Sequence, residues 1–119
     1  MLEAPPDTSI PALRALGFAA ARAEIIGVLE DHIIVPRDWV QRMLAAHQDE
    51  AQVVGGAVDN MAQERLVDWA AFLCEYSHCL APPAGIGGWI PGNNVTYQQK
   101  VLEHFSDILT SRTMGRFPP

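Results

Sequence analysis

The stretch "EIIGVLEDHIIVPRDW", residues 24–39, decides the fold class of this chain. Its first part, residues 24–30, is short, β-branched and apolar on both faces, which predicts a strand buried between two layers. Pro36 suits the first turn of a helix over residues 36–48, because that position needs no intrahelical N–H bond. A strand that is followed at once by a helix is typical of α/β domains.

The same alternation continues on both sides of this stretch. Ser9 is suited to cap a helix over residues 10–22, and a second strand is expected over residues 51–60. Further helices are expected over residues 63–80 and 95–105, with a Pro- and Gly-rich loop at 82–94 between them. The order predicts an α/β fold with a parallel or mixed sheet. Two strands make a marginal sheet, so we expect either further strands in the loop region or a chain that is part of a larger domain.

Length and charge limit the classes of protein that this chain can be. The 119 residues fit an N-terminal loop at 1–8, an α/β domain at 9–105 and a C-terminal tail at 106–119. The formal net charge of −6 argues against nucleic-acid binding, which needs clustered Lys and Arg. The sequence contains no secretion signal, lipidation motif or apolar run long enough to cross a bilayer. We therefore expect a cytoplasmic location.

The two cysteines predict neither a disulfide framework nor a zinc site. Cys74 and Cys79 lie five positions apart in "FLCEYSHCL", with His78 between them. A zinc site would need two more ligands at suitable spacing, and the sequence does not supply them. We expect reduced thiols.

Three adjacent polar residues follow the first predicted strand: Glu30, Asp31 and His32. Ligands of open α/β sheets bind outside the carboxyl ends of strands, which is the position of this triplet. Carboxylate oxygens and an imidazole nitrogen suit Mg²⁺ or Mn²⁺, and these ions suit a diphosphate ligand. The residues themselves equally allow a polar strand exit in which Asp31 and His32 are simply solvated.

A second polar segment, "GGWIPGNNVTYQ", precedes the last predicted helix. Gly92, Asn93 and Asn94 would offer free backbone N–H groups and two amide side chains to a ligand. Trp89 could stack on a sugar or a base. The alternative is a turn in which Asn93 or Asn94 caps the following helix, and the local sequence favours this alternative.

Taken together, these segments resemble family 2 glycosyltransferases of the GT-A fold. The resemblance spans about residues 9–105 and is carried by the order and spacing of four segments: "SIPALRALGFAAARAEIIGVLEDHIIVPRDWVQRMLAAH" (9–47), "VVGGAVDN" (53–60), "DWAAFLCEY" (68–76) and "GWIPGNNVTYQQKVL" (88–102). In such enzymes an apolar strand ends in a D-x-D-type acidic motif, and a Gly- and Asn-rich loop follows later. The resemblance implies a partial GT-A fold, with an incomplete mixed sheet flanked by helices.

The resemblance also implies roles for both polar segments. Glu30 and His32 align with the outer residues of D-x-D and Asp31 with the middle one, so the triplet would face the diphosphate of a nucleotide-sugar donor, usually through Mg²⁺ or Mn²⁺. Asp31 and His32 are the expected metal ligands. The Gly-Asn loop, with Trp89 and residues 92–94, would border the donor sugar and the acceptor. The sequence departs from the motif in Glu30 and His32, and in Gln98 and Gln99 where basic residues are common.

Two parts of such enzymes have no counterpart that we recognise in the sequence. One is the strand–helix–strand unit that holds the nucleotide base, expected before Ser9. The other is a catalytic carboxylate beyond the Gly-Asn loop, where only Glu103 and Asp107 follow and both fit ordinary surface positions. We therefore expect the central fragment of a glycosyltransferase domain, poorly active or inactive alone, from an intact enzyme that is cytoplasmic or peripheral to the cytoplasmic membrane.

A noncatalytic interaction module is the alternative. An incomplete sheet has an unpaired edge, and with 49% hydrophobic residues the chain would hide its exposed faces in a homo-oligomer.

Overall fold

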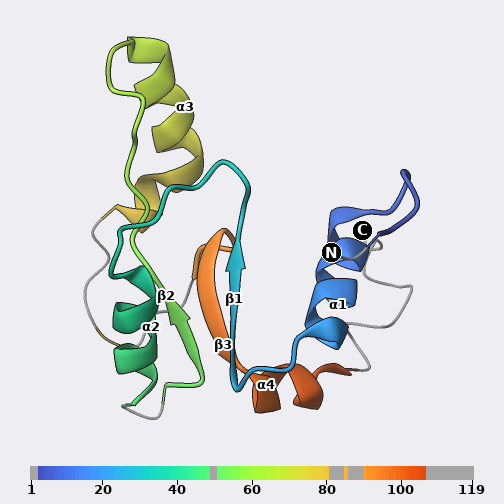
Figure 1. Cartoon of the computed structure of the whole chain (residues 1–119). Coiled ribbons are helices and arrows are strands. Elements are labelled where there is room, and N and C mark those ends of the chain that lie inside the picture. The colour runs from blue at the N-terminus through green and yellow to red at the C-terminus, as the bar shows by residue number, and fades with distance from the viewer. Residues whose placement is uncertain (1–2, 49–50, 81–84, 86–89, 107–119) are drawn as a thin grey trace, which may run out of the picture. The chain divides into compact units, whose positions relative to one another are not determined.

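The computed structural model describes residues 3–48, 51–80, 85 and 90–106. These residues form helices and strands that alternate along most of the chain (Figure 1). In chain order they are α1 (Ile10–Ala20), β1 (Ile25–Leu29), α2 (Trp39–His47), β2 (Val53–Gly55), α3 (Leu66–Tyr76), the 3₁₀ turn η1 (Ser77–Cys79), β3 (Asn94–Gln98) and α4 (Gln99–His104). The predicted class, an α/β domain with an incomplete sheet flanked by helices, is confirmed.

The three strands form one sheet in the order β1-β3-β2, so the last strand in the sequence is the central one (Figure 1). The sheet is antiparallel, whereas the α/β alternation suggested parallel or mixed strands. The difference arises because β3 comes from the end of the chain and enters between the two earlier strands. The backbone N–H of Gly56 beside β2 donates to the carbonyl oxygen of Asn94 at 3.1 Å, and that of Gln99 donates to Glu24 at 2.9 Å.

Residues 95–98 were predicted as the start of a helix, and together with Asn94 they instead form β3. Its Val95 and Thr96 are among the most buried residues described, at 1% and 2% exposure. Their β-branched side chains fit the centre of a sheet, and the helix that was expected from residue 95 starts only at Gln99. The sheet therefore contains the additional strand that two strands alone would need for stability.

Other elements differ from the prediction in extent or in burial. Strand β2 covers only Val53–Gly55 of the expected residues 51–60, and α3 covers Leu66–Tyr76 of the expected residues 63–80. Helix α2 begins at Trp39 rather than Pro36. Pro36 lies before the helix, in a turn in which its carbonyl oxygen accepts the Trp39 N–H at 3.0 Å. Strand β1 is not buried on both faces: Ile26 is buried, whereas Leu29 is 41% exposed. An outer strand of a small sheet has fewer neighbours to cover it than the central strand has.

The chain divides into two compact units, Met1–Ile26 with Tyr97–Pro119, and Gly27–Thr96. In the first, the rings of Phe18 and Tyr97 meet edge to face at 5.8 Å. The cap position predicted for Ser9 is confirmed, although its side chain makes no capping bond.

In the second unit, His47 at the end of α2 is buried and makes hydrogen bonds through both ring nitrogens. Nδ1 lies 2.6 Å from the Ala51 carbonyl oxygen, and Nε2 lies 2.9 Å from the Thr96 hydroxyl. The side chain thus ties α2 to the central strand. Among the described residues, no helix combines the length and the apolar character that a membrane crossing needs.

Candidate functional site

The acidic triplet lies directly after β1, in a turn closed by the Ile33 N–H and the Glu30 carbonyl at 3.1 Å. The His32 ring contacts both carboxylates: Nε2 is 3.4 Å from a Glu30 oxygen and Nδ1 is 3.3 Å from an Asp31 oxygen. Glu30 is 35% exposed, His32 65% and Asp31 fully exposed. The triplet is therefore an open acidic surface with an imidazole against both carboxylates.

The triplet suits Mg²⁺ or Mn²⁺ by the chemistry of its oxygen and nitrogen donors. Its arrangement is less suited, because each ring nitrogen of His32 faces a carboxylate instead of an open position. Across the part of the chain that the structure describes, no group of three or more His, Cys, Asp or Glu side chains is arranged to hold a metal ion. Metal binding by Asp31 and His32 would require the His32 ring to turn away from the acids.

The Gly-Asn loop precedes a strand instead of a helix. Gly92 and Asn93 form a turn, and Asn94 is the first residue of β3. The predictions of a helix N-cap and of free N–H groups at a helix N-terminus are therefore wrong for this loop. Trp89, which was expected to cover a sugar or a base, lies outside the described residues.

Asn94 uses its side chain to join three segments of the second unit. Its Oδ1 accepts a hydrogen bond from Trp39 Nε1 at 2.9 Å, and its Nδ2 donates to the Ala57 carbonyl oxygen at 3.1 Å. Its backbone oxygen also accepts the Gly56 N–H. The amide of Asn94 therefore fixes α2 and the end of β2 against β3.

Asn93 has a different environment. It is 3% exposed, and its Nδ2 donates to the Tyr76 hydroxyl at 3.0 Å. Its Oδ1 is buried and has no hydrogen-bond partner among the described residues. A buried acceptor without a donor costs free energy, so its site is one where a ligand or a water molecule would be stabilising.

Tyr76, the last residue of α3, is the hydrogen-bond partner of Asn93. Burial raises the pKa of its hydroxyl, as do a hydrogen bond with the Glu75 side chain and the negative charges of Glu75 and Glu30. The sequence placed Tyr76 only in the apolar stripe of a helix, and its tyrosine hydroxyl was the one available signal of a polar role.

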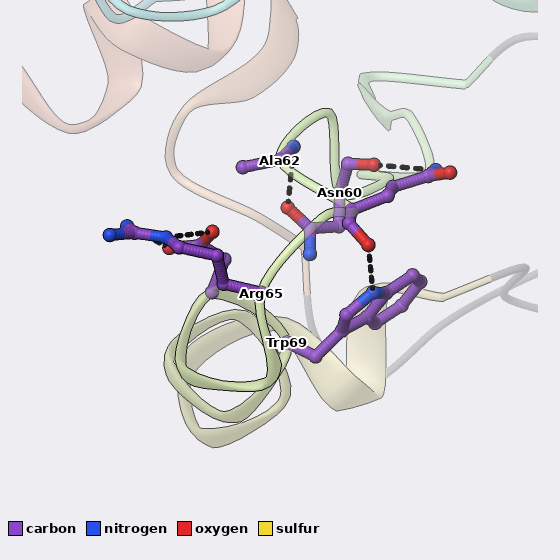
Figure 2. Close-up of polar contacts among 6 residues, drawn as sticks. Asn60, Ala62, Arg65 and Trp69 are labelled. Carbon is purple, nitrogen blue, oxygen red and sulfur yellow. Dashed lines mark hydrogen bonds and ion pairs between the residues drawn. The ribbon is translucent and has the colours of Figure 1, made fainter.

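The start of α3 is set by a network around Asn60, a buried residue (Figure 2). Its Oδ1 accepts the Ala62 N–H at 3.1 Å, and its backbone oxygen accepts Gln63 Nε2 at 2.9 Å. The Gln63 carbonyl oxygen in turn accepts Trp69 Nε1 at 3.3 Å. Figure 2 also shows Arg65 at the helix start, which makes two hydrogen bonds to Asp68, at 2.9 and 2.6 Å.

Contacts between aromatic rings along α3 hold the Tyr76 side chain in place. The Trp69 ring meets Phe72 edge to face at 6.2 Å, and Phe72 stacks on Tyr76 at 5.7 Å. Such pairs hold rings in defined orientations. The hydroxyl that contacts Asn93 is therefore held by a helix whose start and apolar face are both fixed.

The remaining candidates are ordinary side chains. Cys74 is exposed and Cys79 is buried, and both are free thiols. Glu103 is exposed on α4, as expected for a surface carboxylate. Asp107 lies outside the described residues.

Comparison with known proteins identifies the family. The model of the family described as "Glycosyl transferase family 2" matches residues 10–117, which is most of the chain. No curated protein and no solved structure gives a significant match. With the segments around the acidic triplet and the Gly-Asn loop inside the matched region, the chain belongs to glycosyl transferase family 2.

Proposed function

We propose that this chain binds a nucleotide-diphosphate sugar, with Glu30, Asp31 and His32 beside the diphosphate and the Gly-Asn loop beside the sugar. Family membership implies a nucleotide-sugar donor and an acceptor. The observation that carries the assignment of the Gly-Asn loop is the environment of Asn93. Its side chain is buried, its Nδ2 donates to the Tyr76 hydroxyl, and its Oδ1 has no hydrogen-bond partner among the described residues. The triplet is assigned from its position directly after β1 and from the nucleotide-sugar donor that the family implies.

Binding at the triplet is expected to depend on a divalent cation. Two carboxylates placed beside a diphosphate repel it, and the interaction becomes favourable only when positive charge lies between them. Mg²⁺ and Mn²⁺ take carboxylate and phosphate oxygens together, and Mn²⁺ also takes imidazole nitrogen. The formal net charge of −6 adds to the repulsion of an anionic ligand.

Thermal unfolding with and without Mn²⁺ tests the proposal. A ligand at one hundred times its Kd stabilises the folded state by about 2.7 kcal/mol, which corresponds to roughly 10 °C in a domain of this size. We expect a UDP- or GDP-sugar to give such a shift only with Mn²⁺, and Asp31→Ala to abolish it. Asp7→Ala, which removes another exposed aspartate, should keep the shift.

Two results would contradict the proposal. An equal shift in Asp31→Ala and in the wild type would remove the triplet from the binding site. The absence of a shift with every nucleotide sugar would leave self-association as the remaining hypothesis, which the 89% and 76% exposure of Leu66 and Met61 favours.

The proposal concerns donor binding and assigns no catalytic base. A glycosyltransferase that inverts the anomeric centre needs a carboxylate to take a proton from the acceptor hydroxyl. Among residues 90–106 the one acidic side chain is Glu103, on the exposed surface of α4.

A further inference from the structure

We propose that Tyr76 is a positioning residue that orients the Asn93 amide so that its oxygen can accept a hydrogen bond from a sugar hydroxyl of the donor. This inference rests on the proposed function. It goes further by selecting one of the two asparagines, one atom of that asparagine and the part of the ligand that this atom contacts.

The direction of the hydrogen bonds around Tyr76 determines which end of the Asn93 amide is left over. The Asn93 Nδ2 donates to the Tyr76 hydroxyl oxygen, so this oxygen is the acceptor and its own proton points away from Asn93. An amide can meet lone pairs only with its NH₂ group, which is the observed bond from Nδ2 at 3.0 Å.

This arrangement leaves Oδ1 of Asn93 as a buried acceptor without a donor among the described residues. If the tyrosine proton pointed to Asn93 instead, the amide would turn over and present a donor. The Tyr76 oxygen, as acceptor of the Nδ2 bond, therefore decides the hydrogen-bonding character of this point.

An acceptor at this point distinguishes the parts of a nucleotide sugar. Phosphate oxygens are acceptors and cannot satisfy Oδ1, whereas the hydroxyls of the donor sugar and of the ribose can donate. The contact at Asn93 should therefore be made by a hydroxyl, which we assign to the donor sugar. An equal loss of affinity for the matching nucleoside diphosphate, which keeps the ribose, would overturn this assignment.

Calorimetric titration of two ligands in the presence of Mn²⁺ tests this assignment. The ligands are the UDP- or GDP-sugar that stabilises the wild type most and the matching nucleoside diphosphate, which lacks the sugar. Tyr76→Phe keeps the ring that stacks on Phe72 and removes only the hydroxyl. We expect about tenfold weaker binding of the nucleotide sugar and an unchanged Kd for the nucleoside diphosphate.

Two further variants separate positioning from general damage. Asn93→Ala removes the acceptor itself and should show the same selective loss, and adding Tyr76→Phe to it should weaken binding no further, because Tyr76 acts through Asn93. Tyr97→Phe removes the hydroxyl of another tyrosine, whose ring contacts Phe18 and whose pKa is raised by burial, and should bind both ligands as the wild type does.

The outcomes distinguish this inference from the function on which it rests. A wild type that binds neither ligand refutes both. A wild type that binds the nucleotide sugar, with Tyr76→Phe and Asn93→Ala binding it equally well, overturns only the role of Tyr76 and Asn93. A lower unfolding temperature for Asn93→Ala with both affinities unchanged would show that Oδ1 serves an internal water, and it also overturns the inference.

Discussion

Gly56 lies where a single added methyl group would disturb the junction that Asn94 makes. A Cβ built on Gly56 would be 2.4 Å from Asn94 Nδ2 and 3.2 Å from the terminal methyl of Met43. Gly56→Ala therefore requires the Asn94 amide to move by about 1 Å before it reaches ordinary van der Waals contact, near 3.4 Å. The same amide bridges Trp39 and Ala57, so its movement breaks at least one of those hydrogen bonds.

The size of the effect follows from these contacts. Leaving one half-buried partner of Asn94 unsatisfied costs about 1–3 kcal/mol. Alanine recovers about 0.4–1 kcal/mol by restricting the unfolded chain, since Gly56 does not have a positive φ that would strain the new residue. The net expectation for Gly56→Ala is a loss of about 1–2 kcal/mol, or roughly 4–10 °C in Tm for a domain of this size.

Gly17→Ala provides the matched control, measured by the same thermal and urea unfolding. Gly17 lies inside α1, and a Cβ built there has no atom within 4 Å. The methyl group should raise stability by up to about 1 kcal/mol, because alanine is the better helix former. A Gly56→Ala protein as stable as the wild type, beside a stabilised Gly17→Ala protein, would refute the reasoning about Asn94.

Two further predictions concern buried groups of the second unit. Thr96→Val leaves Nε2 of buried His47 without its hydrogen-bond partner and should lower the free energy of unfolding in urea by about 1–3 kcal/mol. The control Thr8→Val, at a peripheral turn, should change it by under about 0.5 kcal/mol. Equal losses in the two variants would contradict the role of His47. Burial raises the pKa of the Cys79 thiol above its usual 9.0, so a thiol reagent should modify exposed Cys74 quickly and Cys79 only on unfolding. The buried neutral thiol of Cys79 stabilises the folded state fully below the pKa of the thiol in the unfolded chain, and this stabilisation is lost as the pH rises through the pKa in the folded state. The free energy of unfolding of the wild type, relative to Cys79→Ala, should therefore fall at alkaline pH. A rise would contradict the prediction.

Local sequence patterns predicted the elements that depend on local interactions. The helix after Ser9, the strand that ends before Glu30 and the helix that contains Trp39 are all present, with ends that lie within three residues of the predicted ones. Each has an apolar spacing or a capping residue within its own length. The acidic triplet could be located for the same reason, since it follows directly from the end of a strand.

The central strand could not be assigned in this way, because its stability comes from partners far along the chain. "NVTYQ" is short, and it runs directly into the helical pattern after Gln99. Its pairing with β1 and β2 decides its conformation, and neither pairing can be recognised from the residues near it in the sequence. The run of Val95, Thr96 and Tyr97 was the available signal, since β-branched and aromatic residues favour strands.

The two adjacent asparagines show why the strand assignment matters for function. If residue 95 began a helix, Asn93 and Asn94 would be similar candidates for a cap or for a ligand. With Asn94 as the first residue of a strand, successive side chains point to opposite faces, so the two amides enter different surroundings. Both ends of the Asn94 amide make hydrogen bonds, with Trp39 and Ala57. The Asn93 amide bonds Tyr76 through Nδ2, and its Oδ1 has no hydrogen-bond partner among the described residues. In the proposed site, the contact of the Gly-Asn loop with the ligand would therefore be made by Asn93, while Asn94 holds the start of β3 against Trp39 and Ala57.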